Sequence, residues 1–266
     1  MTTELSSLPQ EMASLRADGR GPLDFREVDV ERDVLPQTYG SARVVVGGGL
    51  GRGTEVLCAV TASVGEAVGG ACGDVEVLAE WSPATRDRED DRSRQKRGDA
   101  LTRRLRDALE PWRKSAAPSL HVAAALAWRV AVDVVVLADD GSALEAASIA
   151  VRAAVASAEL PATEAVAGED AATAFSLAPA TAAPLTLDVA KLPVVVAVHV
   201  LGGAFAADAT ADERVDATLS VAVAEDGTLG ATDVLAGTFP PGDLAAAIAA
   251  APAIATPLLA AAVAAT

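Results

Sequence analysis

The sequence is poor in the residues that build disulfide frameworks and zinc sites. It holds two cysteines, Cys58 and Cys72, each in an apolar stretch, and two histidines, His121 and His199, far apart. A disulfide-stabilised small domain needs more cysteines, and a zinc site needs closely spaced Cys and His pairs. We therefore expect two buried, reduced thiols, no bound metal and no cofactor.

Aromatic and basic side chains are also scarce. Phe, Trp and Tyr make up 3% of the 266 residues, and 21 Lys and Arg stand against 37 Asp and Glu, for a net charge of −16. An acidic surface repels phosphate backbones, which argues against general binding to nucleic acids. Hydrophobic residues nevertheless form 51% of the chain, so the core has to be built mainly from Ala, Val and Leu. Such a core favours sheets covered by closely docked helices.

One apolar stretch is long enough to cross a membrane, whereas the start of the chain is polar and acidic. The first fifteen residues hold no basic, apolar leader, so an intracellular, reducing compartment is expected. Residues 241–266 are rich in alanine, which contributes little to membrane insertion, and Pro252 and Pro257 interrupt a helix there. This stretch is predicted to be a broken, Ala-rich C-terminal helix on the body of the protein, with a membrane anchor as the less favoured alternative.

The pattern of apolar residues predicts a strand-rich first part followed by a helix. A short helical segment is expected over residues 1–15. Alternation with a period of two predicts a strand over residues 25–35, and stretches rich in β-forming residues and separated by glycines predict the next strands, over residues 40–47, 54–65 and 74–82. Four strands in series with short connections predict an antiparallel meander. After a charge-rich loop, the spacing of Leu101, Leu105 and Trp112 predicts a helix whose other side carries several arginines.

The second part of the chain alternates strands and helices. A long strand that begins at Leu126 ends in an Asp-Gly turn, and a helix follows, capped by Ser142 with Glu145 three residues later. Residues 160–184 predict a surface excursion. Three strands are predicted after it, over residues 185–189, 192–203 and 216–230, the last with an Asp-Gly hairpin at Asp226–Gly227. This order of elements favours an α+β fold with a mixed sheet.

A long motif near the N-terminus resembles the opening of the RNase PH-like subunits of the RNA exosome. Their pattern runs Arg-x-Asp-Gly-Arg, then an aromatic-Arg pair, then Gly-Ser-Ala. The matching residues are Arg16, Asp18, Gly19, Arg20, Phe25, Arg26, Gly40, Ser41 and Ala42. Two later blocks, residues 128–155 and 208–230, resemble the same family in the same order, so the resemblance spans about residues 14–237.

The resemblance implies an α+β, RNase PH-like fold of the type called ribosomal protein S5 domain 2-like, with mixed sheets packed with helices and two βαβ-like halves. The RNase PH-like domain would cover residues 16–240, with halves of about 16–125 and 126–240. The resemblance also implies a six-membered ring of RNase PH-like subunits with S1/KH cap proteins, and a central channel that guides single-stranded RNA for 3′-to-5′ processing and decay. Neither DNA nor a membrane is an expected partner, and the implied locations are the nucleus, the nucleolus and the cytoplasm.

The acidic residues between 208 and 216, which we call the acidic block, bear on whether the chain is a catalytic or a non-catalytic subunit of such a ring. Phosphorolysis needs arginines and amides to hold phosphate, and a carboxylate to handle a proton or a metal. Catalytic members of the family carry a dense acidic run here, whereas this chain has four acids that resemble the non-catalytic subunits: Asp208, Asp212, Glu213 and Asp216. We expect no catalytic residue and interpret the four acids as a solvated turn. The alternative is a phosphorolytic 3′-to-5′ exoribonuclease that works with a partner subunit.

A basic segment is the candidate for RNA contact. Residues 86–114 hold eleven of the 21 Lys and Arg. Six of these are expected to contact RNA phosphates without sequence preference: Arg92, Arg94, Lys96, Arg97, Arg103 and Arg104. Arg97 is also the nearest match to an arginine of the catalytic members, and Trp81 and Trp112 are the aromatic residues at hand for base stacking, with Trp112 expected in the core. The alternative is a solvated loop and a helix whose arginines pair with acids.

The residues of the opening motif are interpreted as architectural. Gly19 suits a turn with positive φ, while Arg16, Arg20 and Arg26 are expected to pair with acids and to hold the N-terminal segment on the body. The predicted structural motif comprises Arg16, Asp18, Gly19, Arg20, Arg26, Gly40, Ser41, Asp208 and Thr210.

A glycine-rich loop supports one further alternative, a nucleotide-binding enzyme. The loop Gly47–Gly53 follows an apolar run, as phosphate-binding loops do. A Walker loop requires Gly-Lys-Ser/Thr, but the chain has Arg52, Gly53 and Thr54, and a Rossmann fingerprint requires a helix where β-branched residues follow instead. We therefore expect a lengthened hairpin turn between two strands.

Overall fold

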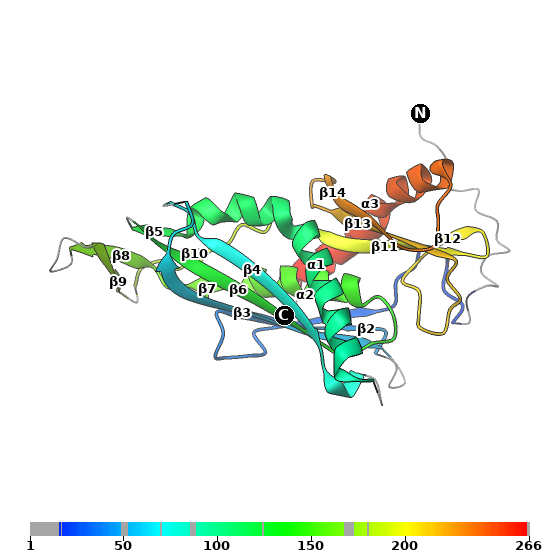
Figure 1. Ribbon diagram of the computed structural model, residues 1–266, viewed down its shortest axis with the longest axis horizontal. Helices are drawn as coiled ribbons and strands as arrows, with labels where there is room; N and C mark the ends of the chain where they lie inside the picture. The colour runs from blue at the N-terminus through cyan, green and yellow to red at the C-terminus, as the bar shows by residue number, and fades with distance from the viewer. Residues whose placement is uncertain are drawn as a thin grey trace.

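The described part of the chain forms two main sheets and three α-helices in a computed structural model (Figure 1). The described residues are 16, 18–48, 53–69, 71–85, 89–123, 125–167, 173–179 and 181–264. The helix predicted over residues 1–15 and the centre of the glycine-rich loop lie outside them.

The first sheet has the strand order β1-β2-β3-β6-β4, and β5 pairs with β6. Its strands are β1 (Val28–Arg32), β2 (Gly40–Val46), β3 (Thr54–Glu66), β4 (Asp74–Trp81), β5 (His121–Ala123) and β6 (Leu126–Ala138). The first three strands form the predicted antiparallel meander, but β4 runs parallel to β6 and does not pair with β3. The prediction is therefore wrong at the fourth strand, because a helical crossover brings the long, apolar β6 between β3 and β4.

The crossover helix α1 (Asp91–Ala116) begins earlier in the chain than predicted. Asp90 caps it by accepting a hydrogen bond from the Ser93 amide at 2.9 Å, so much of the expected charge-rich loop is helix. The unit β4-α1-β6 is a parallel βαβ unit. The first sheet therefore extends past residue 125, where the boundary between the two halves was predicted, and β6 pairs with three strands that precede this residue.

Side chains of α1 occupy the free edge of β4, where a neighbouring strand would otherwise pair. They bind the backbone of alternate residues of β4. The Thr102 hydroxyl binds the amide and the carbonyl of Ala79, Arg106 donates to the Val77 carbonyl, and Arg113 donates to the Val75 carbonyl. The distances are 2.8 and 3.1 Å for the threonine hydroxyl, 2.8 Å for Arg106 and 2.5 Å for Arg113. An edge strand satisfied in this way is protected from pairing with another chain.

The second sheet is antiparallel, with the strand order β12-β11-β13-β14. Its strands are β11 (Val194–Leu201), β12 (Ala204–Ala207), β13 (Ala217–Val223) and β14 (Leu229–Ala236). The predicted hairpin at Asp226–Gly227 joins β13 to β14 and is confirmed, with Gly227 at a φ of 81°. Only a residue without a Cβ adopts such a turn at no steric cost.

Helix α2 (Ala143–Ser157) lies between the two sheets, against β2 and β3 on one side and β11 on the other. Its polar side chains bind the backbone at the start of β11 and just before it, where β12 does not pair. Three pairs do this: Glu145 accepts from the Ala197 amide at 3.2 Å, Ser148 accepts from the Val195 amide at 2.8 Å, and Arg152 donates to the Leu192 carbonyl. This role explains why an Ala-rich, buried helix retains charged residues.

The C-terminal helix α3 (Pro241–Ala264) packs on the second sheet. The prediction of a broken helix is wrong, because α3 is continuous and contains Pro252 and Pro257. Its buried stripe runs along the whole helix and holds it in place: Ala247, Ala251, Ile254, Ala255, Leu258 and Ala262. By length and hydropathy α3 could span a membrane, and 44% of its most apolar 18 residues are buried against the rest of the protein.

The predicted surface excursion over residues 160–184 contains a small hairpin that projects from one end of the molecule (Figure 1). The hairpin consists of β8 (Thr163–Ala167) and β9 (Thr173–Leu177). At its base β7 (Glu159–Leu160) pairs with β10 (Leu185–Thr186).

Candidate functional site

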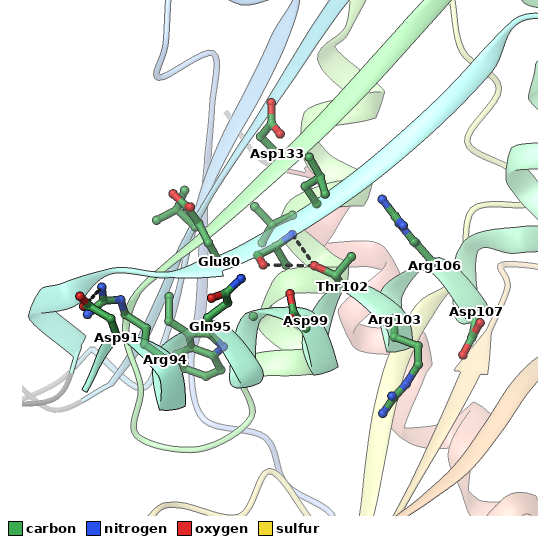
Figure 2. A pocket seen from close by; sticks show the side chains of 16 residues that line it. Glu80, Asp91, Arg94, Gln95, Asp99, Thr102, Arg103, Arg106, Asp107 and Asp133 are labelled. Atoms are coloured by element: carbon green, nitrogen blue, oxygen red, sulfur yellow. Dashed lines mark hydrogen bonds and ion pairs between the residues drawn. The ribbon is translucent and has the colours of Figure 1, made fainter. Parts of the chain in front are cut away.

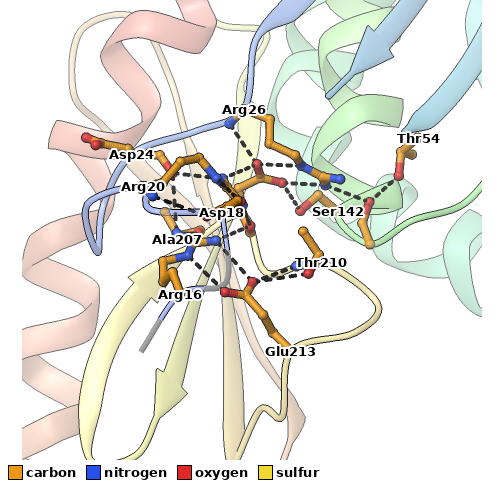
Figure 3. Close-up of polar contacts among 12 residues, drawn as sticks. Arg16, Asp18, Arg20, Asp24, Arg26, Thr54, Ser142, Ala207, Thr210 and Glu213 are labelled. Carbon is orange, nitrogen blue, oxygen red and sulfur yellow. Dashed lines mark hydrogen bonds and ion pairs between the residues drawn. The ribbon is translucent and has the colours of Figure 1, made fainter. Parts of the chain in front are cut away.

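Three arginines of the opening motif converge on two acids of the acidic block (Figure 3). Arg26 holds the Asp208 carboxylate with two side-chain hydrogen bonds, from Nε to Oδ2 at 2.8 Å and from Nη2 to Oδ1 at 2.7 Å. Arg20 donates to the same carboxylate at 2.7 Å. Arg16 holds Glu213 in a bidentate pair, at 2.9 and 3.1 Å. These ion pairs tie the start of the described chain to the connection between β12 and β13.

Asp208 is the centre of this arginine cluster. It is fully buried, and it also accepts hydrogen bonds from the Ser142 hydroxyl at 2.7 Å and the Arg26 amide at 2.8 Å. Burial alone would raise the pKa of Asp208, but the hydrogen bonds and charge of Arg26 hold it below its ordinary value. The prediction of a solvated turn is therefore wrong for Asp208 and Glu213, because arginines distant in sequence enclose both carboxylates. Asp212 and Asp216 are exposed.

The same contact decides how α2 begins. Ser142 has a φ of 59°, and its side chain makes no capping hydrogen bond, because its hydroxyl binds Asp208. The predicted cap is therefore wrong, and its predicted partner Glu145 is buried in the core. Burial raises the pKa of Glu145 from 4.5 to about 7. The folded protein thus keeps a proton that the unfolded chain releases, so the stability this group contributes is present below pH 4.5 and lost as the pH rises through 7.

The other residues of the motif shape the backbone around the cluster. Gly19 has a φ of 76°, in the left-handed region that glycine favours. The Asp18 carboxylate accepts a hydrogen bond from Arg20 at 2.6 Å. A Cβ on Gly40 would lie 2.4 Å from a carbonyl oxygen of α2, so glycine allows β2 to approach that helix. The Ser41 hydroxyl accepts a hydrogen bond from the Leu35 amide at 2.9 Å. The Thr210 amide donates to the Glu213 carboxylate at 2.8 Å.

The six candidates for RNA contact divide into two sets on α1. Three pair with acids: Arg94, Arg97 and Arg104. The other three are exposed and have no ion pair within the described ranges: Arg92, Lys96 and Arg103. Their spacings of four and seven residues place these three on one side of a helix with 3.6 residues per turn. We call this set the exposed stripe.

Arg97 is enclosed by the protein. Its guanidinium lies 3.5 Å from the centre of the Trp81 ring and donates to Glu89 at 2.8 Å and to Asp139 at 3.0 Å. Trp81 is only 9% exposed, so it does not offer a free face for base stacking. Trp112 lies in the core, as expected, and its indole N–H donates to a backbone carbonyl at 2.7 Å.

Comparison with known proteins identifies the family. The model of the RNase PH family, described as the 3′ exoribonuclease family, domain 1, matches residues 24–161, more than half of the chain. The chain belongs to the RNase PH family. A similar curated protein is the exosome complex component Rrp42 of Pyrobaculum aerophilum, 28% identical over 242 residues that cover 88% of this chain and 83% of that protein.

Solved structures share the RNase PH-like fold. A chain of an archaeal exosome core is 23% identical, with a TM-score of 0.72 and coverage of 92% of this chain and 90% of that one. A chain of the Archaeoglobus fulgidus exosome with RNA bound to the active site is 24% identical, with a TM-score of 0.71 and 91% of each chain covered. Rice (Oryza sativa) Rrp46 is 20% identical, with a TM-score of 0.60 and coverage of 91% and 96%. The predicted fold is thereby confirmed.

In this RNase PH-family chain the glycine-rich loop joins two strands. Val46 of β2 pairs with Thr54 of β3 across it, and Gly47 has a φ of 72°. β3 begins at Thr54, where a nucleotide-binding loop would need a helix. The predicted hairpin connection is confirmed, although residues 49–52 lie outside the described part of the chain.

Some important residues escaped the sequence interpretation. Arg152 is fully buried, donates to Glu225 at 2.6 Å and holds the end of the loop before β11. Its signal in the sequence is a set of polar residues at Glu145, Ser148 and Arg152, spaced to share one face of an Ala-rich helix.

Both cysteines are free thiols, but their burial differs. Cys58 is buried, which raises the pKa of its thiol, whereas Cys72 is only partly buried and departs from the prediction. Within the described residues, no three His, Cys, Asp or Glu form a group that could hold a metal.

Proposed function

We propose that this chain is a non-catalytic ring subunit of an exosome, where it helps to form the channel that guides single-stranded RNA for 3′-to-5′ processing and decay. Its family, the similarity to a protein named as an exosome component and the fold shared with chains of solved exosomes support the proposal. Its neighbours would be other RNase PH-like subunits of the ring, and S1/KH cap proteins would lie on the ring.

One observation carries the proposed absence of catalysis: the groups that phosphorolysis would need are bound to one another. Asp208 and Glu213 are held by arginines, and Arg97 is held between two carboxylates and an indole ring. A phosphate ion at Arg97 would have to displace Glu89 and Asp139, each already in an ion pair at 3.0 Å or less. Such a site lacks the preorganised, unoccupied donors that stabilise a transferring phosphoryl group.

The exposed stripe supports the RNA-guiding part of the proposal. Arg92 and Lys96 stand near the beginning of α1, and Arg103 lies two turns further on. Exposed cations without a bound carboxylate neutralise phosphates without reading sequence, which suits a channel that passes many RNAs.

Co-expression tests the ring assignment. The tagged full-length chain, produced with the RNase PH-like subunits of its own organism, should be recovered with them in a stable, equimolar complex. A chain that stays monomeric in their presence would refute the assignment. Imaging of a fluorescent fusion in that organism tests the predicted location in the nucleus, the nucleolus and the cytoplasm.

Phosphorolysis assays test the proposed absence of catalysis. The purified chain in phosphate buffer should release no nucleoside diphosphates from single-stranded RNA. Release by the chain or its complex that is lost in Asp216→Asn, but kept in the distant control Asp243→Asn, would establish the phosphorolytic alternative instead. Asp216 is the informative position because it is an exposed acid of the block, outside the arginine cluster.

A further inference from the structure

The outer face of the first sheet carries carboxylates around a half-exposed leucine. Every second side chain of β4 is exposed, and Leu78 is 46% exposed. The strand register places Asp133 of β6 between Leu78 of β4 and Ala59 of β3. Burial, and then the charges of Glu80 and Glu76, raise the pKa of Asp133. Negative charge therefore accumulates on this face next to an apolar surface.

A groove of about 870 Å³ lies between this face and helix α1, beside the hydrogen bonds from Thr102 and Arg106 to the β4 backbone (Figure 2). Figure 2 shows Glu80 and Asp133 on the sheet side of the groove, and Asp99 and Arg103 on the helix. Leu78 is also part of the lining. The lining of the groove thus combines a half-exposed leucine with charged side chains from the sheet and from α1.

Negative charge in the groove exceeds positive charge. Two of its three arginines are already paired, Arg94 with Asp91 and Arg106 with Glu76 at 3.0 Å. The third, Arg103, belongs to the exposed stripe. Four lining carboxylates have no ion pair with any described residue: Glu80, Asp99, Asp107 and Asp133. A phosphate backbone would be repelled here, so the surroundings of Arg94 do not favour the RNA contact expected of it.

We propose that this groove binds a basic segment of a partner protein. Lys or Arg side chains of that segment pair with Glu80, Asp99 and Asp133, and an apolar side chain covers Leu78. The surplus of carboxylates favours a cationic occupant over RNA, and the exposed leucine favours a peptide over a small polyamine. The proposal does not depend on the proposed ring role, so either can fail while the other stands.

Binding of a synthetic peptide to the full-length chain tests the proposal. The probe repeats Leu-Lys-Leu-Arg, carries a fluorescent label and is titrated at about 0.15 M salt, where surface charges more than a Debye length apart are screened. The groove variant is Glu80→Gln with Asp133→Asn. The matched control, Glu159→Gln with Asp243→Asn, removes the same charge from exposed residues outside the groove. Leu78→Ser tests the apolar contact separately.

We expect the groove variant to bind the peptide about tenfold more weakly than the control variant, and Leu78→Ser to weaken binding about threefold. Thermal unfolding of each variant checks that the fold is kept, which is expected because Leu78 and Glu80 are exposed and Asp133 is only partly buried. Equal binding by the groove and control variants would overturn the proposal, because it would show a general attraction to an acidic protein. Spermine that competes with the peptide, together with unchanged binding by Leu78→Ser, would overturn it in favour of a small-polycation site.

Discussion

Replacing Asp208 with asparagine removes the charge at the centre of the arginine cluster and keeps the shape of the side chain. The carboxylate is fully buried, and the side chains of Arg20 and Arg26 that bind it are 14% and 9% exposed. Removing one partner of a buried, hydrogen-bonded ion pair leaves the other charge uncompensated, which costs about 3–5 kcal/mol. We expect Asp208→Asn to lower the free energy of unfolding by this amount at neutral pH.

The same reasoning predicts the pH dependence of the loss. The pKa of Asp208 in the folded protein lies below its ordinary value of 3.8, so the stabilisation is present above pH 3.8 and is lost as the pH falls through the folded-state value. The difference between the native chain and Asp208→Asn should therefore shrink in acid and stay constant near neutrality.

Urea unfolding, followed by tryptophan fluorescence and circular dichroism, measures the effect on the full-length chain. Asp216→Asn is the matched control, because Asp216 belongs to the same acidic block but is exposed and accepts one backbone hydrogen bond at 3.0 Å. Its loss should stay within about 1 kcal/mol. The double variant Arg26→Gln with Asp208→Asn should lose less than the sum of its two single variants. A loss in Asp208→Asn no larger than in the control would refute the anchoring role of the cluster.

Three further predictions address α2, β2 and α1. Glu145→Gln removes a carboxylate whose pKa is raised to about 7, so above pH 7 it should stabilise the chain by up to about 3 kcal/mol and below pH 4.5 change little, measured by urea unfolding at both pH values. Gly40→Ala places a Cβ 2.4 Å from a backbone oxygen and should destabilise by about 1–3 kcal/mol, whereas Gly242→Ala, with open space, should not. Replacing the three cations of the exposed stripe with Gln in the assembled ring should make the salt dependence of RNA binding shallower by up to about 2 in logarithmic slope, and an unchanged slope would remove them from the RNA path.

Local patterns predicted a large part of the fold. The β-forming residues of 40–47 and 54–65 match β2 and β3, and the helical spacing around Leu105 matches α1. These elements follow from side-chain periodicity over a few residues, which the sequence carries directly. The position of β4 could not be read in this way, because the choice between β3 and β6 as its neighbour depends on a crossover through α1.

Sequence patterns over a few residues did not predict which acid each arginine binds. The sequence identifies Arg16, Arg20 and Arg26 as architectural, but its local pattern predicts a solvated turn for the acids that bind them. An ion pair is decided by which distant segments meet and by how much water remains between them, and neither is encoded in neighbouring residues.

The sequence by itself determined the family motif, the elements and the Ala- and Val-rich core, because periodicity and turn chemistry act over short distances. Only the tertiary structure decided that Ser142 serves Asp208 instead of capping α2, that Arg97 is enclosed, and that Arg94 faces carboxylates. These outcomes depend on burial and on the partners that folding brings together. The chemistry available to a charged residue is therefore set by its neighbours in space.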